Sequence, residues 1–499
     1  MSTSKGAQSA DANLRTISGL EPESVWRQFA GIASVPRCSQ HEEKIRDYVA
    51  RFAEERKLEW QADAAGNMIV RKPGSKGREK RPTVVVQGHL DMVCEKNEGT
   101  EHDFSRDPIR LVVDGDWLRA SGTTLGADNG LAVAMALALL DDPGIEHPPL
   151  EALFTVDEEG GLVGATKLDG SIVSGKTILN LDSEEEGTFY IGCAGGCNTE
   201  GWVPMQQEPG LAGIPSSVAL TVSVTGLRGG HSGAEIHEGR GNAIRLGARF
   251  LWNAARKFEL RVFRAEGGGM HNAIPRELFA GVVVGQGDVQ AFEQMAAEYQ
   301  TLFRAELADI EPGLTLAVRR ADEQPVRHLT EESSDRLLSV LYSLPHGVDS
   351  MSREIAALVA SSTNLAAIHL SEHEAHILTS QRGSLDSMTQ DLSDRVGAIV
   401  EHAGGRIKTF GIYPGWPPEP DSQLVKLCSR TYSKLNGKEP EIKAIHAGLE
   451  CGVLGQKVPG SSLISFGPDI RGAHTPDERV HVQSTDRMWR FLLEVLKEL

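Results

Sequence analysis

The chain has 499 residues, more than one ordinary domain contains, so we expect at least two domains. Its hydrophobic content of 40%, with 53 glycines and 23 prolines, is typical of a folded, loop-rich α/β protein and excludes extended disorder. The formal net charge of -18 argues against nucleic acid as a partner, because phosphate binding requires a basic surface.

The chain shows no sign of export or of membrane insertion. Residues 1–16 are polar and lack the apolar core of a signal peptide. The longest apolar run, residues 131–140, is too short to span a bilayer. There are only six cysteines, and Cys193 and Cys197 have no second pair nearby, so buried free thiols are a better interpretation than a structural zinc site. These features favour a reducing cytoplasm.

The first part of the chain predicts alternating strands and helices. After a lead-in that we expect to be disordered to about residue 20, residues 21–34 and 39–57 predict helices. Apolar strands then alternate with helical stretches, as the segments 83–91, 130–140, 150–159 and 176–185 illustrate. This alternation predicts an α/β fold with a mostly parallel central sheet and helices on both faces.

The pattern changes near residue 216. Residues 216–227 alternate apolar and polar side chains, which is typical of a half-exposed antiparallel strand. The α/β pattern returns after the glycine pair at 404–405. We therefore predict a first domain of residues 1–215 and 405–499, interrupted by an α+β insert over 216–404 that could hold two similar α+β subdomains.

Side chains able to bind a metal ion gather where the predicted strands end or helices begin. In open α/β sheets, the functional site lies outside the carboxyl ends of the strands. Each side chain alone has a simpler interpretation, such as a helix cap, a solvated acidic turn or an ordinary loop histidine. The set comprises His89, Asp91, Asp128, Asp157, Glu158, Glu159, Asp182 and His474.

So many acids at one sheet edge require a counter-charge, which a metal ion would supply. Two histidines and three carboxylates exceed one tetrahedral zinc but fit two zinc ions that share a carboxylate; manganese or cobalt also suits these donors. In an extended strand, His89 and Asp91 point to the same side, so one could bind metal while the other orients it. Alternation favours Glu159 as a ligand, but spacing alone does not separate its role from that of Glu158.

Six motifs resemble those of the di-zinc peptidase and aminoacylase superfamily. The motifs are "GHLDMV", "LGADNGLAVAMALALL", "TVDEEGGLVGA", "LNLDSEEEG", "GLRGGHSG" and "GAHTPDERV". Two others, "STNLA" at 362–366 and "IHAGLECG" at 445–452, point to the branch of cytosolic aminoacyl-histidine dipeptidases, also called Xaa-His or non-specific dipeptidases. The resemblance runs from about residue 20 to the C-terminus without a departure at the metal or base positions.

The resemblance implies a ligand set and a catalytic base. One zinc ion would be bound by His89 and Asp182, the other by Glu159 and His474, with Asp128 bridging the two. Asp91 would fix the orientation of His89. Glu158 would be the general base for the attacking water. The family also has a cis peptide bond after the bridging aspartate, here Asp128–Asn129.

Four further residues are implied as substrate contacts. His231 would assist at the oxyanion, Asn272 would contact the substrate, and Arg382 would bind the substrate carboxylate through two hydrogen bonds. Glu450 would bind the free amine. In the simpler interpretations, His231 is a turn residue, Asn272 caps a loop and Arg382 is a surface charge.

The implied function is hydrolysis of dipeptides, with a preference for Xaa-His or with broad specificity. An aminoacylase or a tripeptidase with the same metal core is the nearest alternative, and a catalytically inactive metal-binding relative is another. A nucleotide-binding protein is excluded by the lack of a glycine-rich phosphate loop in the right context. The long insert suggests that its two halves serve one active site within a chain, which leaves a homodimer optional.

Overall fold

The computed structural model describes residues 11–210, 216–353 and 355–499 and divides the chain into two compact units. Unit 1 comprises Met1–Cys193, Trp416–Ala444 and Leu449–Leu499; unit 2 comprises Ala194–Gly415 and Ile445–Gly448. Strands β9 (Gly195–Pro204) and β19 (Arg406–Tyr413) pair with each other and form one end of the nine-stranded sheet of unit 2. They extend unit 2 beyond the expected insert of residues 216–404 on both sides.

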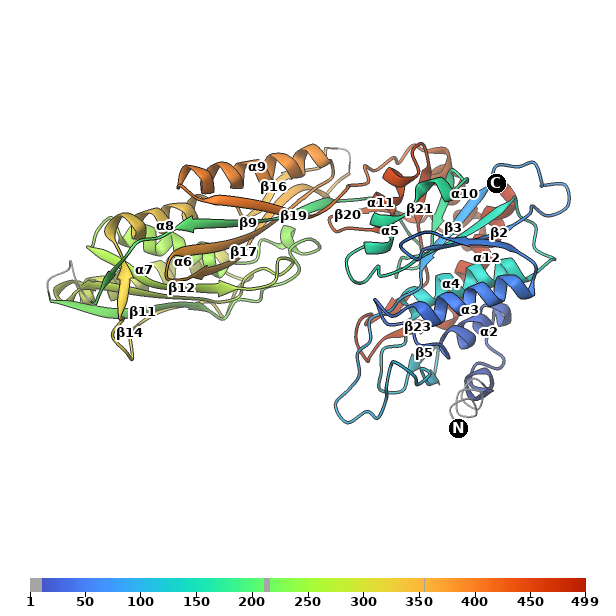
Figure 1. Ribbon diagram of the computed structural model, residues 1–499, viewed down its shortest axis with the longest axis horizontal. Helices are drawn as coiled ribbons and strands as arrows, with labels where there is room; N and C mark the ends of the chain where they lie inside the picture. Colours follow the sequence, from blue (N-terminus) through green and yellow to red (C-terminus); the bar gives the residue numbers. More distant parts are fainter. Residues whose placement is uncertain (1–10, 211–215, 354) are drawn as a thin grey trace. The chain divides into compact units, whose positions relative to one another are not determined.

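Unit 1 is built on an eight-stranded sheet in the order β1-β2-β6-β3-β7-β21-β8-β20 (Figure 1). The four central strands, β6, β3, β7 and β21, are parallel, and antiparallel pairs flank them. This confirms the predicted mostly parallel sheet. The strands are β1 (Glu59–Ala62), β2 (Met68–Lys72), β3 (Val84–His89), β6 (Leu150–Thr155), β7 (Thr177–Asn180), β8 (Thr188–Cys193), β20 (Glu441–Ile445) and β21 (Ser462–Ser465).

Helices α2, α3, α4, α10 and α12 pack their apolar side chains into one cluster on one face of this sheet. Val84 and Val86 of β3 belong to this cluster, whereas Val85 points to the other face, where α5 and α11 lie (Figure 1). The helices are α2 (Glu23–Ile32), α3 (Glu43–Glu55), α4 (Ala127–Asp141), α5 (Val163–Lys167), α10 (Gln423–Asn436), α11 (Glu450–Lys457) and α12 (Val482–Glu498). A small sheet of β4 (Leu111–Asp114), β5 (Trp117–Ala120), β22 (Ile470–Arg471) and β23 (Arg479–His481) completes unit 1.

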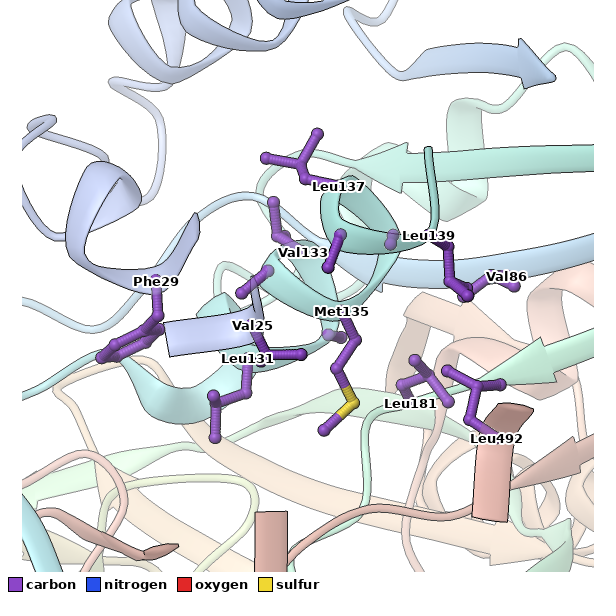
Figure 2. Packing of buried hydrophobic residues seen from close by; sticks show 14 of the residues in the cluster. Val25, Phe29, Val86, Leu131, Val133, Met135, Leu137, Leu139, Leu181 and Leu492 are labelled. Carbon is purple, nitrogen blue, oxygen red and sulfur yellow. The ribbon is translucent and has the colours of Figure 1, made fainter. Parts of the chain in front are cut away.

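Helix α4 is the centre of this core. All its residues from Asn129 to Leu140 are buried, as expected of a helix that is apolar on every side. Figure 2 shows its side chains among those of α2, α12 and the sheet, with Leu131, Val133, Met135, Leu137 and Leu139 beside Val25, Phe29, Val86, Leu181 and Leu492. This packing fixes the start of α4 close to the carboxyl end of β3. None of the helices in the described part of the chain has the length and apolar character that crossing a membrane requires.

Unit 2 contains a nine-stranded sheet in the order β14-β11-β13-β12-β17-β18-β9-β19, with β16 paired to β17. Besides β9 and β19, its strands are β11 (Ser217–Thr225), β12 (Leu260–Gly268), β13 (Leu278–Gly285), β14 (Thr315–Arg320), β16 (Gly347–Met351), β17 (Val359–Leu370) and β18 (Glu374–Gly383). Its helices are α6 (Ala243–Ala254), α7 (Val289–Leu307), α8 (Glu331–Ser343) and α9 (Asp386–His402). A separate short pair joins β10 (Gln207–Pro209) to β15 (Arg327–Leu329).

The sheet of unit 2 has two halves of the same topology. One half runs β11-α6-β12-β13-α7-β14 and the other β9-α8-β17-β18-α9-β19. In each half, the first and third strands lie side by side in the middle. The halves join where β12 pairs antiparallel with β17, so they share one continuous sheet. The first half is inserted in the chain between β9 and α8 of the second.

The expected disorder up to about residue 20 is wrong for the described residues of that segment. Residues 11–16 are helical, and Asn13 is buried. Its side-chain Nδ2 donates to the Ile109 carbonyl at 2.9 Å, and its Oδ1 accepts from the Leu111 amide at 3.1 Å. One buried amide with two main-chain partners anchors a segment whose polar composition suggested disorder. Residues 1–10 lie outside the described residues.

The Asn13 contact predicts a measurable loss of stability. Asn13→Ala leaves a buried carbonyl and a buried amide at residues 109 and 111 without partners, so we expect the free energy of unfolding of unit 1 to fall by about 1–3 kcal/mol. The exposed Arg15 provides the control, and Arg15→Ala should leave it nearly unchanged. Chemical denaturation followed by tryptophan fluorescence measures both. Equal stability of the two variants would contradict this anchoring role.

Candidate metal centre

The start of α4 lies against the end of β3. A side chain at Gly88 would come within 2.5 Å of the Ala132 Cβ, so only glycine allows this approach. Asn129 holds the two elements together: its Oδ1 accepts from the His89 amide at 3.2 Å, and its Nδ2 donates to the Leu181 carbonyl at 3.0 Å. Asn129 follows a cis peptide bond from Asp128, as the resemblance implied. The ends of β3 and β7 are thereby brought to one edge together with Asp128.

His89 is buried at this edge between three carboxylates. Its Nε2 lies 3.1 Å from Asp128 Oδ1 and 3.5 Å from Asp182 Oδ1. Its other ring nitrogen, Nδ1, lies 3.3 Å from Asp91 Oδ1. The ring thus faces Asp91 with one nitrogen, which leaves Nε2 directed at the two remaining acids.

Asp91 fixes more than the histidine. Its Oδ1 accepts from the Glu158 amide at 3.0 Å, and its Oδ2 accepts from the Glu159 amide at 3.1 Å and from the Ser39 hydroxyl at 2.8 Å. Burial raises the pKa of Asp91, but the close, positively charged form of His89 and the hydrogen bonds from the Glu158 amide and the Ser39 hydroxyl outweigh burial and lower the pKa to about 2. A charged Asp91 therefore holds His89 and the main chain of the Glu158–Glu159 turn in one arrangement.

Two groups of possible ligands share Asp128. While its Oδ1 faces His89, its Oδ2 lies 3.2 Å from His474 Nε2, which in turn lies 2.9 Å from Glu159 Oε1. Within each group, the donor atoms lie within 4.8 Å of one another. The first group is His89, Asp128 and Asp182; the second is Asp128, Glu159 and His474.

One pair of donor atoms is close together without forming a hydrogen bond. Glu159 Oε1 is buried and makes no hydrogen bond within the described residues, although His474 Nε2 is 2.9 Å away. Atoms that are close but misaligned for a hydrogen bond can both point at a third position, as ligands of a cation do. Imidazole nitrogens and carboxylate oxygens suit zinc, and also manganese or cobalt.

Glu158 lines the site without joining either shared group. Its Oε2 lies 4.0 Å from His89 Nε2. Burial raises the pKa of Glu158 well above its ordinary value; His89 opposes this shift, while Asp182 and Glu450 add to it. The geometry also allows a third group, His89, Glu158 and Glu159, so it leaves open whether Glu158 binds metal.

Glu450 is the first residue of α11 and is buried near the same edge. Its Oε2 accepts from Gln87 Nε2 at 2.6 Å and from the Thr155 hydroxyl at 2.9 Å. Its Oε1 is buried and has no hydrogen-bond partner in the described part of the chain. Burial raises the pKa of Glu450 to about 7, an effect that Asp182 strengthens and His89 weakens. One oxygen of this carboxylate is therefore available to a ligand.

The other expected substrate contacts, His231, Asn272 and Arg382, lie in unit 2. His231 Nδ1 accepts from the Gly233 and Ala234 amides at 3.2 and 2.9 Å, so in the neutral ring Nε2 carries the hydrogen. Burial, together with the charge of Arg382, lowers the pKa of His231 and favours this neutral form.

Arg382 lies on β18 and is buried. Its Nη1 donates to the Tyr413 hydroxyl at 2.7 Å, while its Nε has no hydrogen-bond partner among the described residues. The two motifs that indicated the narrower branch meet nearby: Ser362 Oγ lies 2.7 Å from His446 Nε2.

Asn364 of "STNLA" holds the loop that carries Asn272. Its Nδ2 donates to the His271 and Ala273 carbonyls at 3.1 and 2.8 Å. Asn364 is itself buried on β17, so the sheet fixes the main chain on either side of Asn272.

The structure adds buried groups that sequence reasoning did not assign. Glu478 and Arg37 both bind the main chain of residues 125–128. The only signal for Glu478 was its place in the "GAHTPDERV" motif, four residues after His474. Cys193 and Cys197 are free and buried, as predicted, whereas a disulfide that joins Cys38 to Cys94 was not foreseen.

Comparison with known proteins agrees with this geometry. The sequence model described as Peptidase family M20/M25/M40 matches residues 85–498. The chain is 39% identical over 483 residues to the cytosol non-specific dipeptidase of Escherichia coli (strain K12), covering 97% of this chain and 99% of that protein. The crystal structure of aminoacylhistidine dipeptidase from Vibrio alginolyticus superimposes with a TM-score of 0.91 at 36% identity, covering 97% of this chain and 98% of that one.

More distant structures share the fold alone. A tripeptidase from Staphylococcus aureus superimposes with a TM-score of 0.53 at 13% identity, over 96% of this chain and 98% of that one. The family match spans most of the sequence, and the relatives are aligned over nearly their full lengths. The chain therefore belongs to peptidase family M20/M25/M40.

Proposed function

We propose that the chain is a dipeptidase that hydrolyses the peptide bond with two bound metal ions and Glu158 as the general base. The observation that carries this proposal is Asp128, whose two oxygens face two different histidines. The similarity to the Escherichia coli dipeptidase over 97% of the chain supports the same substrate class.

The proposed ligands follow from the two groups around Asp128. One metal ion would be held by His89 and Asp182 and the other by Glu159 and His474, and Asp128 would belong to both sets of ligands. We propose two zinc ions for each chain, with manganese or cobalt as alternatives, because all three accept these nitrogen and oxygen donors.

The residues of unit 1 then have distinct tasks. Bound metal ions lower the pKa of a water molecule and polarise the scissile carbonyl. Glu158 takes the proton from the water and passes it to the leaving amine. Asp91 keeps His89 Nε2 directed at its metal position and also holds the main chain of Glu158, so it positions both a ligand and the base.

The remaining residues are proposed to recognise the two charged ends of a dipeptide. Glu450 Oε1 binds the free amine, since this buried oxygen has no partner among the described residues. Arg382 binds the carboxylate with two hydrogen bonds. His231 donates its Nε2 hydrogen to the developing oxyanion, and Asn272 contacts the substrate. Binding of the free amine by Glu450 favours a dipeptide over an acylated amino acid, which has no free amine.

Substrate preference, location and assembly are part of the same proposal. We propose either a preference for Xaa-His or broad specificity, with aminoacylase or tripeptidase activity as the nearest alternative. The name of the Escherichia coli relative supports a cytoplasmic enzyme. Both halves of unit 2 carry proposed substrate contacts, His231 and Asn272 in the first half and Arg382 in the second, and we propose that a homodimer is optional for activity.

A substrate panel tests the proposed function. We expect hydrolysis of carnosine, Leu-Gly or Gly-His, no hydrolysis of a tripeptide or an N-acetyl amino acid, and close to two metal ions per chain. A chelator should abolish the activity, and added zinc, manganese or cobalt should restore it. Cleavage of the longer or acetylated compounds would instead indicate a tripeptidase or an aminoacylase. Metal binding without any cleavage would indicate an inactive relative.

Two variants separate the base from the ligands. Glu158→Gln should keep two metal ions and lower kcat by about 100-fold or more, because the amide cannot accept the proton of the water. His474→Ala should bind one metal ion fewer, since it removes a donor from one group only. Metal content by mass spectrometry and kcat on one dipeptide measure both effects. Loss of a metal ion from Glu158→Gln would mean that Glu158 is a ligand.

The amine contact predicts a selective effect of Glu450→Gln. Removing the charge should weaken binding of the dipeptide by about tenfold or more. This is the range expected for a hydrogen bond between charged groups. The Ki of the desamino analogue of the same dipeptide, which lacks the amine, should change by less than about twofold. The KM of the dipeptide and the Ki of the desamino compound measure the two effects. Equal weakening of both compounds would show that Glu450 supports packing and does not bind the amine.

A further inference from the structure

The loop that carries Asp128 is held by one buried carboxylate. Both oxygens of Glu478 accept two main-chain hydrogen bonds each, and the side chain is 2% exposed. A carboxylate offers about four acceptor positions, so this one is saturated by the loop. The donors are the amides of Leu125 at 2.7 Å, Gly126 at 2.8 Å, Ala127 at 2.7 Å and Asp128 at 3.2 Å.

Arg37 holds the other side of the same loop. Its guanidinium donates to the Gly126 carbonyl through Nη2, and through Nη1 to the Leu90 and Asp91 carbonyls at 3.0 and 2.8 Å. Arg37 is 3% exposed, and burial lowers its pKa to about 10 against the opposing effect of Glu478, so it stays charged at neutral pH. It therefore ties the loop to the main chain that follows His89.

The main chain of this loop is not helical where it reaches Asp128. Asp128 and Asn129 have non-helical backbone angles, and Gly126 has a φ of 69°. A side chain at Gly126 would come within 2.7 Å of the Met92 sulfur, so the loop is also closely packed. The main chain at Asp128 must nevertheless be placed well enough for its two oxygens to reach two histidines.

We infer that Glu478 is a positioning residue for metal binding, which acts by fixing the main chain at Asp128 so that this side chain can serve both metal ions. The inference rests on the proposed ligand set. This role differs from a purely structural one because Asp128 belongs to both groups of ligands. If Asp128 is misplaced, binding of both metal ions should weaken together. Removal of His474 should affect only one.

Glu478→Gln is the direct test. The amide keeps the size of the side chain, but its NH₂ group would face two of the four main-chain donors. We expect binding of both metal ions to weaken by about 10–100-fold, the range for residues that support a metal ligand. Titration of the metal-free full-length protein with Co²⁺, followed by visible absorption and by metal content after dialysis, measures this without reference to activity.

Glu151→Gln is the matched control. Glu151 is a buried glutamate of the same unit that accepts from the Ser174 and Gly175 amides, both at 2.9 Å, and it takes no part in either metal group. We expect this variant to lose thermal stability but to bind two Co²⁺ with the affinity and spectrum of the unaltered protein. Arg37→Lys provides a second variant if Glu478→Gln does not fold, because it keeps the charge and loses part of the loop contacts. Arg37→Lys should also weaken the binding of both metal ions.

The outcomes distinguish the inference from the proposed function. If the unaltered protein binds two Co²⁺ and Glu478→Gln binds two with the same affinity and spectrum, the inference is wrong and the proposed function stands. The inference also fails if Glu478→Gln loses one metal ion alone, as expected for His474→Ala. If the unaltered protein does not bind two metal ions, the proposed function itself fails.

Discussion

The carboxylate of Asp128, with one oxygen facing His89 and the other facing His474, is the constraint on which the site of unit 1 depends. The two histidines come from opposite ends of the chain, one from the end of β3 and the other from the loop between β22 and β23. A single side chain can lie between them only if the start of α4, the end of β3 and this late loop are fixed at the same edge. The buried cluster around α4 provides that fixation, because every face of the helix is packed.

Main-chain amides donate most of the hydrogen bonds to two buried carboxylates near this site. Asp91 accepts from the amides of Glu158 and Glu159, and Glu478 accepts from those of residues 125–128. Such bonds stabilise the charged form of a buried acid without adding a positive charge that would compete with a metal ion. Arg37 is the exception: its guanidinium binds main-chain carbonyls, which directs its hydrogen bonds away from the acids. Because Arg37 binds main-chain carbonyls, the two oxygens of Asp128 face the two histidines.

Local sequence patterns predicted the elements better than the contacts between them. β-branched runs indicated β3, an unbroken apolar stretch indicated α4, and alternation placed His89 and Asp91 on one side of a strand. The contacts of Asn13, Arg37 and Glu478 were missed because each joins residues far apart in sequence, up to 353 positions for Glu478 and Leu125. The roles of Glu158 and Glu159 could not be separated by spacing, and their geometry still allows both as ligands. Only the family resemblance assigned these roles, with Glu159 as a ligand and Glu158 as the base.

The position of β21 has a consequence for synthesis of the protein. This strand, Ser462–Ser465, lies between β7 and β8, both of which precede unit 2 in the chain. A ribosome therefore completes all nine strands of the unit 2 sheet before the central sheet of unit 1 can close. Until then, β7 and β8 expose strand edges that have no partner, a state prone to wrong association. A nascent chain released between residues 448 and 462 would contain every strand of the unit 2 sheet but would lack β21 of the unit 1 sheet, and with it His474 and Glu478.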